Sequence, residues 1–557
     1  MEAMERAKLW ASNAYFDAET RSAAAQAMKD ENLLLRLFGT ELRFGTGGLR
    51  GILGVGTTRL NRYTVARATL GLAHSLKRRG CFSGVVIAHD SRHGSEEFTA
   101  VTASVLAAQG IPVYVFPALA PTPMLSYAVR ALHLDAGVMI TASHNPAEYN
   151  GYKVYGPDGC QITDGDAADI TECIRAVGYT DPVLASEADA RRAGLWVDVP
   201  ETISRSFAQA CLFCRADPSV STAIHVVYTP LYGTGLMPVR EVLHLMQGVK
   251  VTEVTEQCEP NGDFPTCPKP NPEVPEALEL GIALSKQVQA DLLLATDPDC
   301  DRVGIAVPDE SGEYVRLTGD ELGLLLLDHI LSTRMSQGSL PPKAVVAKSI
   351  VSSDLAFSIC RQYGVTLRET LTGFKYIGEM IGLLEAEGRE NDFVFGFEES
   401  CGYLAGTHVR DKDGVMASML VCEMAQALKS RGFTVWQALC RLYEKHGFLS
   451  ARSLSFAITG ALPMEEMTQI MQTLRQAPPS VLCGHPLSET RDYLTGVDDL
   501  PRSNVLVYLA DGVKAIIRPS GTEPKVKVYL FAKASTKADS QALLNALEAQ
   551  MRSLIPV

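Results

Sequence analysis

The chain has 557 residues, of which 46% are hydrophobic and 21% are charged. At roughly 150 residues per domain this length predicts about four domains, and the apolar content excludes a largely disordered chain. Its 64 acidic residues against 51 basic residues leave a net charge of −13, which disfavours binding to nucleic acid or to an acidic membrane surface.

The 13 cysteines are odd in number and scattered, so no disulfide framework is indicated. The N-terminal segment is acidic and lacks an apolar core, unlike a signal or transit peptide. The longest apolar run, residues 322–327, is far shorter than the roughly 20 residues that span a bilayer. We therefore expect a cytoplasmic protein without a membrane segment.

Helical and strand-like segments alternate along most of the chain. Apolar strand-like stretches separated by amphipathic helical ones predict three α/β units with mainly parallel sheets. The predicted strands are residues 84–88, 113–116 and 136–141 in the first unit, 224–228, 249–254 and 291–296 in the second, and 344–347, 365–368 and 393–397 in the third.

A polar loop follows the third predicted strand of each unit. These loops are residues 141–146, 297–302 and 398–402. In open parallel sheets, ligands bind beyond the carboxyl ends of the strands, so the three loops are expected to face one cleft.

The last hundred residues have a different pattern. Short alternating strands at 505–508, 513–517 and 526–530 precede one terminal helix, which predicts a small α+β domain. We place a linker at residues 181–198. The predicted domains are residues 1–200, 201–318, 319–447 and 448–557.

Three aspartates occupy every second position after the stretch 291–296: Asp297, Asp299 and Asp301. In an extended backbone such side chains share one face, so the carboxylates should converge. Three adjacent negative charges favour a hard divalent cation, most simply Mg²⁺. A calcium hand is excluded, because Arg302 and Pro308 replace its glycine and its final glutamate. A surface Asp-Pro turn is the alternative interpretation.

Ser143 lies in the first polar loop, beside His144 and ten residues before Lys153. A hydroxyl beyond a strand end with such neighbours can be a covalent nucleophile. No Gly-x-Ser-x-Gly elbow surrounds it, which disfavours acyl-hydrolase chemistry. In isolation, Ser-His-Asn-Pro is more typical of a turn whose side chains bond the local backbone.

Residues 518–524, Arg-Pro-Ser-Gly-Thr-Glu-Pro, join two predicted strands. Their amides could form a concave anion site, and Arg518 offers a planar set of donors for phosphate; an ordinary Pro/Gly connection fits equally well. The glycine-rich segment 46–51 is a weaker signal. The C-x-x-C pair Cys211 and Cys214 is interpreted as buried thiols, because no second ligand pair lies at zinc spacing.

Together these segments resemble the α-D-phosphohexomutase superfamily, the phosphoglucomutase and phosphomannomutase enzymes, over nearly the whole chain. The matching segments occur in the family's order. They are residues 44–51, 141–153, 297–302, 372–375, 396–402 and 518–524.

The resemblance implies a heart-shaped protein in which three similar α/β domains, with mixed, mainly parallel sheets, and a C-terminal α+β domain surround a central cleft. It implies that Ser143 is the phosphorylated serine and holds the metal together with Asp297, Asp299 and Asp301. Around the transferring phosphoryl group it places Arg50, His144, Lys153 and Arg302, with His144 and Lys153 both open as the general base. The implied substrate contacts are Thr372, Gly373, Lys375, Glu398, Ser400, Arg518, Ser520, Gly521 and Thr522.

The implied activity is an isomerase that interconverts glucose 1-phosphate and glucose 6-phosphate through a phosphoserine and a glucose 1,6-bisphosphate. Mg²⁺ and catalytic glucose 1,6-bisphosphate are the implied cofactors, and a small sugar phosphate is the partner of a monomer or weak homo-oligomer. Phosphomannomutase or phosphopentomutase activity on the same scaffold stays open. Residues 299–303 also match the D-x-D-x-V motif of aspartate-nucleophile phosphatases, a remote alternative, and a non-catalytic sugar-phosphate-binding protein is a further one.

Overall fold

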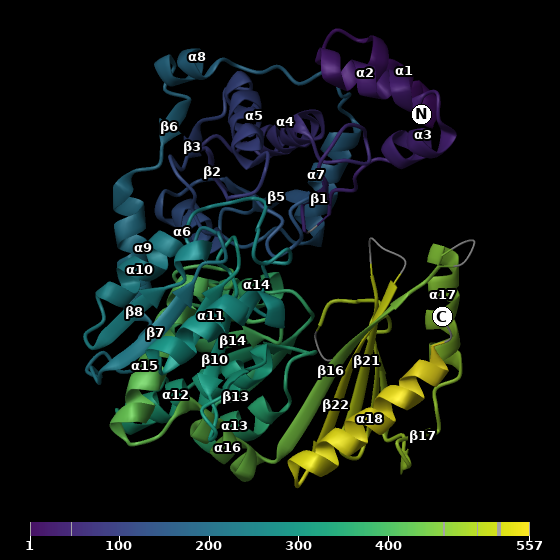
Figure 1. Cartoon of the computed structure of the whole chain (residues 1–557). Coiled ribbons are helices and arrows are strands. Elements are labelled where there is room, and N and C mark those ends of the chain that lie inside the picture. Colours follow the sequence, from purple (N-terminus) through teal and green to yellow (C-terminus); the bar gives the residue numbers. More distant parts are fainter. Residues whose placement is uncertain (1, 46, 460–462, 498–499, 521–524, 556–557) are drawn as a thin grey trace. The chain divides into compact units, whose positions relative to one another are not determined.

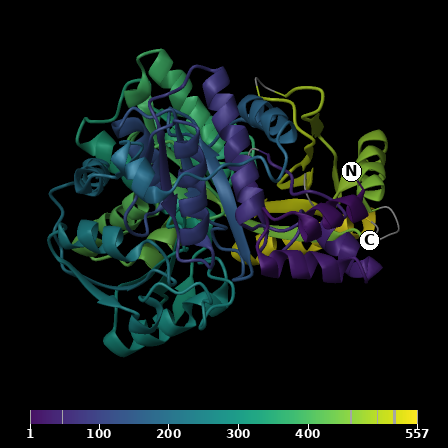
Figure 2. The same ribbon diagram turned by 90° about the horizontal axis from the view of Figure 1, so that it is seen from above.

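The computed structural model describes residues 2–45, 47–459, 463–497, 500–520 and 525–555. The chain forms two compact units, one of residues 1–322 and 374–434 and the other of residues 323–373 and 435–557. Figures 1 and 2 show their helices and strands from two directions. Among the described residues, no helix combines the length and apolar character needed to cross a bilayer.

Three short helices open the first unit: α1 (Ala3–Ser12), α2 (Ala18–Ala27) and α3 (Glu31–Phe38). Asp17 caps α2 by accepting the Thr20 backbone N–H, and Asp30 caps α3 in the same way. Trp10 is fully buried and stacks on Phe16 at 4.6 Å between ring centroids. The helices, drawn in purple in Figure 1, thus pack around an aromatic cluster that also includes Tyr63 and Tyr179.

The first sheet has six strands in the order β1-β5-β4-β2-β3-β6. The pairs among β2, β3, β4 and β6 are parallel, whereas β5 runs antiparallel to both β1 and β4. The three predicted strands are confirmed as β2, β3 and β4. The elements are β1 (Leu49–Ile52), α4 (Arg62–Arg78), β2 (Val85–His89), α5 (Ser95–Ala108), β3 (Val113–Val115), α6 (Thr122–Ala131), β4 (Ala136–Ile140), β5 (Tyr149–Tyr155), α7 (Asp164–Arg175), α8 (Glu187–Arg192) and β6 (Trp196–Asp198).

The predicted linker at residues 181–198 is wrong. Its last residues form β6, which pairs in parallel with β3 and joins the first sheet. Trp196 is 7% exposed and packs in the core of that sheet. Burial of this indole explains why the segment belongs to the domain.

The second sheet has the order β11-β10-β9-β7-β8. The predicted strands are confirmed as β7, β8 and β9, which pair in parallel, and an antiparallel edge of β10 and β11 completes the sheet. The elements are α9 (Glu201–Phe213), β7 (Ile224–Thr229), α10 (Leu236–His244), β8 (Val249–Glu253), η1 (Thr255–Gln257), α11 (Pro275–Val288), β9 (Leu292–Thr296), β10 (Val303–Pro308) and β11 (Tyr314–Arg316).

The third predicted set of strands also forms. In the second unit, β12 (Val345–Ser349) pairs in parallel with β13 (Thr366–Thr370); in the first unit, β14 (Phe393–Glu398) pairs antiparallel with β15 (Gly402–Ala405). The neighbouring helices are α12 (Gly319–Ser336), α13 (Leu355–Tyr363), α14 (Lys375–Ala386), η2 (Glu390–Asp392), α15 (Gly414–Ser430) and α16 (Val435–His446).

The C-terminal part of the second unit is an antiparallel sheet in the order β16-β22-β21-β20-β19. The terminal helix α18 (Lys537–Leu554) packs across one face of it, drawn in yellow in Figure 1. The predicted strands and helix are confirmed, and the unpredicted α17 (Pro463–Gln476) contributes to the same core. The strands are β16 (Phe448–Ala457), β17 (Val481–Leu482), β18 (His485–Pro486), β19 (Glu489–Asp492), β20 (Leu506–Ala510), β21 (Val513–Pro519) and β22 (Lys525–Ala534).

Candidate active site

Three polar loops of the first unit meet beyond the ends of β4, β9 and β14. The Ser143 hydroxyl, after β4, donates to Asp297 after β9 at 2.7 Å. The backbone N–H of Val303, which follows the aspartates, donates to the Cys401 carbonyl after β14 at 3.0 Å. The prediction that these loops come together is therefore confirmed within this unit.

Each of the three loops holds one non-glycine residue in the left-handed region. These residues are Ser143 (φ 53°), Cys300 (φ 51°) and Cys401 (φ 62°). Side chains disfavour this conformation, and such strained positions cluster at functional sites because the surrounding structure fixes them. The left-handed backbone conformation that the three loops share indicates that they belong to one functional site.

Ser143 is held by the residues behind it. Its backbone N–H donates to the Thr141 hydroxyl at 2.8 Å, and that hydroxyl donates to Asp90 at 2.5 Å. The Arg92 guanidinium donates to the Ser143 carbonyl and forms an ion pair with Asp90. The serine is 3% exposed. Its hydroxyl therefore has a fixed direction, toward the aspartates.

The three aspartates converge as predicted, although not by way of an extended backbone. Residues 298–300 form a turn with Cys300 in the left-handed region. Asp297 Oδ1 accepts the backbone N–H groups of Asp301 and Arg302 at 3.1 and 3.0 Å, which closes the turn. One carboxylate oxygen of each aspartate lies within 4.8 Å of the others, and all three residues are buried.

Burial and mutual repulsion dominate the electrostatics of this cluster. Burial, followed by the nearby Asp299 and Asp301 charges, raises the pKa of Asp297 well above its usual range. Burial opposes ionisation of Asp299 too, but Lys153, the hydrogen bond with Asp297 and Lys412 together lower the pKa of that carboxyl. A bound cation would relieve the same repulsion. The cluster thus has the charge and the donor atoms of a divalent cation site.

Two lysines border the cluster. The Lys153 ammonium, on β5, lies 2.8 Å from Asp299 Oδ2 and 3.8 Å from Asp301 Oδ2. The Lys412 ammonium lies 2.7 Å from Asp301 Oδ2. Although burial favours the neutral amine, Asp301 and Asp411 raise the pKa of Lys412. Both side chains therefore supply fixed positive charge at the aspartates.

His144 lies beside Ser143, with Nδ1 at 3.2 Å from the serine hydroxyl oxygen. Burial, then the positive charges of Arg302 and Arg50, lowers the pKa of His144 well below its ordinary value. The imidazole is therefore neutral at pH 7. The exposed Arg50 on β1 lies within electrostatic reach of it.

Arg302 and the glycine-rich segment occupy places that the sequence could not specify. The Arg302 guanidinium donates to Glu273 at 2.6 Å, and its Nε lies 3.9 Å from Asp301 Oδ1.

The glycine-rich segment lies against β5. Gly48 has φ 72°, and a Cβ there would lie 1.9 Å from the Tyr152 carbonyl oxygen. Only glycine allows this segment to approach β5 so closely.

The third loop carries Glu398 and Ser400. Glu398 is 5% exposed, and its negative charge contributes to the raised pKa of Lys412. Burial and then Glu398 raise the pKa of the neighbouring Glu399 to about 8. Lys375, at the start of α14, lies 3.4 Å from Asp164.

The remaining predicted site residues belong to the second unit. Thr372 and Gly373 follow β13, and Gly373 has φ 121°. Arg518 lies near the end of β21, and the Ser520 backbone N–H donates to the Lys525 carbonyl at 2.8 Å. Gly521 and Thr522 lie outside the described residues. Their assignment to a phosphate clamp stays a prediction.

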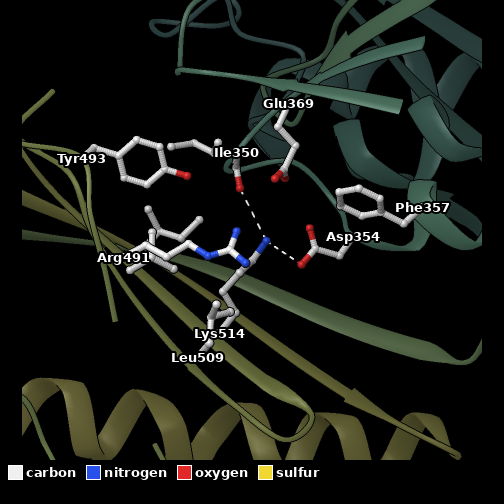
Figure 3. Close-up of a pocket in the computed structure, with 10 residues that line it drawn as sticks. Ile350, Asp354, Phe357, Glu369, Arg491, Tyr493, Leu509 and Lys514 are labelled. Carbon is white, nitrogen blue, oxygen red and sulfur yellow. Dashed lines mark hydrogen bonds and ion pairs between the residues drawn. The ribbon is translucent and has the colours of Figure 1, made fainter. Parts of the chain in front are cut away.

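A cavity of about 170 Å³ that contains several charged side chains lies within the second unit (Figure 3). The Lys514 ammonium lies 2.6 Å from one Asp354 oxygen, and the buried Lys348 ammonium lies 3.1 Å from the other and 2.6 Å from Glu369. The described lining residues include none that the sequence assigned to the site. The carboxylate of Asp354 lies between the two lysines, and Glu369 pairs with Lys348. These alternating charges explain how Lys348 and Lys514 can both be buried.

Several site residues were missed by the sequence analysis. Lys412 lies in the charged run 410–413, which is typical of a solvated loop. Here the other three residues of the run are buried and the Lys412 side chain is 14% exposed. The Thr122 hydroxyl donates to Asp299 at 3.0 Å, and Arg92 supports the Ser143 loop. A run of four charged residues a few positions after the apolar strand β15 was the available signal for Lys412.

The geometry combines a fixed hydroxyl, a carboxylate cluster and several cations, the elements that phosphoryl transfer needs. Three family models match the chain: phosphoglucomutase/phosphomannomutase, alpha/beta/alpha domain I over residues 41–180, domain II over 206–312 and domain III over 318–445. The chain belongs to the phosphoglucomutase/phosphomannomutase family. Three α/β/α domains with mixed, mainly parallel sheets and a C-terminal sheet domain thus form the family fold.

Relatives of this phosphoglucomutase/phosphomannomutase family member agree with that assignment. A phosphoglucomutase of Staphylococcus epidermidis is 37% identical over 507 residues, covering 88% of this chain and 90% of the relative. One of Staphylococcus aureus is 35% identical over 522 residues, covering 92% and 93%. These matches extend over most of both chains, so the family resemblance is not confined to single motifs.

Solved structures share the fold. A phosphoglucomutase/phosphomannomutase family protein from Burkholderia thailandensis has a TM-score of 0.68 at 18% identity, covering 92% of this chain and 97% of its own. Parafusin, a phosphoglucomutase from Paramecium, has a TM-score of 0.68 at 17% identity, covering 92% and 95%.

Proposed function

We propose that this chain is an isomerase that interconverts glucose 1-phosphate and glucose 6-phosphate through a phosphoserine at Ser143 and a glucose 1,6-bisphosphate. The observation that carries the proposal is the 2.7 Å hydrogen bond from Ser143 to Asp297, because it joins residues 154 positions apart in two α/β domains. The relatives named phosphoglucomutase support glucose phosphates as the substrates.

The aspartate cluster fits a magnesium ion. Within the described part of the chain, Asp299 and Asp301 each retain one buried carboxylate oxygen without a hydrogen-bond partner. Such oxygens are costly unless a cation or donor satisfies them. Asp297, Asp299, Asp301 and Ser143 would hold the ion. When bound, Mg²⁺ would neutralise charge on the transferring phosphoryl group.

The protein's own groups orient the reaction. Lys153 and Lys412 supply positive charge beside the aspartates, and the neutral His144 lies 3.2 Å from the Ser143 oxygen. As Ser143 takes a phosphoryl group, its oxygen bonds to phosphorus and the bond from phosphorus to the sugar oxygen breaks. The hydroxyl proton turns from Asp297 to His144 Nδ1, and the departing sugar oxygen takes up that proton. The reverse step gives the phosphoryl group to a sugar hydroxyl.

The bisphosphate must turn end for end before the second transfer. We assign Glu398 and Ser400 to the sugar hydroxyls and Thr372, Gly373 and Lys375 to a specificity loop. The non-reacting phosphate would bind the segment with Arg518, Ser520, Gly521 and Thr522. Catalytic glucose 1,6-bisphosphate would phosphorylate Ser143 again whenever the bisphosphate intermediate dissociates from the enzyme. We place the domains at residues 1–200, 201–318, 319–447 and 448–557. The first two each enclose one family match, and the third begins one residue after the start of the match over 318–445.

The deciding experiment compares kcat/KM for glucose 1-phosphate, mannose 1-phosphate and ribose 1-phosphate, each with Mg²⁺ and a trace of its bisphosphate. We expect the glucose substrate to have the highest value. A higher value for mannose or ribose 1-phosphate would reassign the substrate. Absence of turnover with all three, in protein that still binds glucose 6-phosphate, would favour a non-catalytic binding protein.

A further inference from the structure

A second group of metal-type donors lies outside the aspartate cluster. Cys211 is in α9, and His408 and Asp413 lie in the segment between β15 and α15. Cys211 Sγ is 3.6 Å from Asp413 Oδ2, and His408 Nε2 is 2.8 Å from the same oxygen. All three donor atoms lie within 4.8 Å of one another. Both cysteines of the C-x-x-C pair thus contact side chains about 200 residues downstream: Cys211 contacts Asp413, and Cys214 contacts His408.

The donors are buried and their carboxylate is already oriented. Cys211 and Asp413 are 0% exposed, and the His408 side chain is 8% exposed. Asp413 Oδ1 accepts the backbone N–H groups of Val415 and Met416 at 2.8 and 3.0 Å, which caps α15. This cap directs the other oxygen, Oδ2, toward the cysteine and the histidine.

Cys214 supplies a partner for the second imidazole nitrogen. Its sulfur lies 3.6 Å from His408 Nδ1, on the side of the ring opposite Asp413. A metal-binding imidazole usually donates its other N–H to an acceptor, which fixes the ring and its tautomer. The C-x-x-C pair can therefore provide one ligand, Cys211, and one outer contact, Cys214.

We propose that Cys211, His408 and Asp413 bind a divalent transition-metal ion of the zinc class. A tetrahedral ion with Zn–S of about 2.3 Å and Zn–O of about 2.0 Å places sulfur and oxygen about 3.5 Å apart, close to the observed 3.6 Å. The nitrogen and oxygen must separate by about 0.5 Å to reach the same geometry. Thiolate and imidazole ligands favour zinc over magnesium, whereas the all-oxygen aspartate cluster has the opposite preference.

Binding requires defined proton losses. The Cys211 thiol releases its proton, Nε2 of His408 must be free of a proton, and the imidazole keeps its proton on Nδ1, directed at Cys214. The ion thus replaces the hydrogen atoms that now lie between Asp413 Oδ2 and its two neighbours. No oxidant or further reactant is needed.

The site would fix a segment that also reaches the aspartate loop. The Gly414 backbone N–H donates to the Cys300 carbonyl at 3.1 Å, and a Cβ on Gly414 would lie 2.5 Å from that oxygen. Lys412, one residue before Asp413, pairs with Asp301. Occupancy should therefore stabilise the position of Lys412 as well as the fold.

Cobalt titration tests the proposal on the full chain. Co²⁺ is added to metal-free protein in excess Mg²⁺, and the near-ultraviolet thiolate-to-cobalt charge-transfer absorption is followed. The aspartate cluster contains no sulfur, so the band reports a thiolate-bound ion, and the cysteine variants then assign it to the new site. We expect saturation at one Co²⁺ per chain, also in Asp297→Asn. Absence of the band in the wild-type protein would overturn the proposal without any variant.

Variants locate the sulfur ligand. Cys211→Ala should abolish the band, whereas the matched control Cys360→Ala, at another buried helical cysteine, should keep it. Cys214→Ala should weaken Co²⁺ binding by roughly 10-fold, the effect of losing an outer contact. A band of full strength in folded Cys211→Ala would refute the assignment. If that variant does not fold, X-ray absorption of the wild-type zinc complex decides, because a first shell without sulfur excludes Cys211.

Discussion

Replacing Lys412 with methionine tests whether a buried cation holds the aspartate loop. The Lys412 ammonium lies 2.7 Å from Asp301 Oδ2, and the two side chains are 14% and 2% exposed. Methionine keeps most of the side-chain volume and removes the charge. Asp301 therefore loses its 2.7 Å partner while the packing changes little.

The expected cost follows from burial and distance. Unit charges 2.7 Å apart attract by about 6 kcal/mol at an effective dielectric constant of about 20, and losing one partner of a buried pair costs about 3 to 5 kcal/mol. Lys153 remains 3.8 Å from the same oxygen, so we expect a loss near the lower limit, about 3 kcal/mol. The matched control is Lys429→Met: its pair with Asp291 is 2.7 Å long but its side chain is 46% exposed, which predicts less than about 1 kcal/mol.

Calorimetric melting measures both variants with and without magnesium. For a unit of this size, about 3 kcal/mol lowers the melting midpoint by roughly 3 to 6 °C, and the control should shift by less than roughly 2 °C. Magnesium should recover part of the Lys412→Met loss, because it restores positive charge beside Asp301. Equal shifts in the two variants, or a loss that magnesium leaves unchanged, would refute this reasoning.

Three further predictions test individual residues. Ser143→Ala should abolish turnover and leave the circular dichroism spectrum unchanged; retained activity would eliminate the covalent step. Arg518→Ala should raise KM for the sugar phosphate by roughly 10- to 100-fold through loss of a charge-assisted contact of about 1.5 to 3 kcal/mol, and an unchanged KM would argue against the phosphate clamp. Burial and then Glu398 raise the pKa of Glu399 from 4.5 to about 8, so ionising this group costs more in the folded state and wild-type stability falls as pH rises between these values. The melting midpoint of Glu399→Gln should therefore rise relative to that of the wild type as pH increases across this range. A difference between the two midpoints that does not change with pH would contradict the assigned pKa.

The repeating part of the fold follows from the sequence because buried parallel strands leave a clear apolar pattern. Strands such as β4 and β9 are buried along their whole length, so their residues could be read directly. Edge strands β1 and β11 contain exposed or half-buried positions and lack that signal. Strand β6 was mistaken for a linker, because only pairing with β3 gives its three residues a place in the sheet.

The site was predictable where neighbours in sequence are also neighbours in space. Asp297, Asp299 and Asp301 could be grouped by their spacing. The turn that brings them together depends on the left-handed backbone conformation of Cys300, which the sequence pattern did not predict. Lys412 was missed because its partner, Asp301, is over a hundred residues away and a charged run normally indicates solvent. The partners of Cys211 were missed for the same reason, since His408 and Asp413 become its neighbours only through folding.

Locating the phosphate on the enzyme tests the central claim most directly. The chain is incubated with Mg²⁺ and labelled glucose 1,6-bisphosphate, digested, and analysed by mass spectrometry before and after hydroxylamine treatment. We expect one labelled peptide, phosphorylated at Ser143 and unaffected by hydroxylamine. Label on Asp297, Asp299 or Asp301 that hydroxylamine removes would identify an aspartate nucleophile and contradict the account.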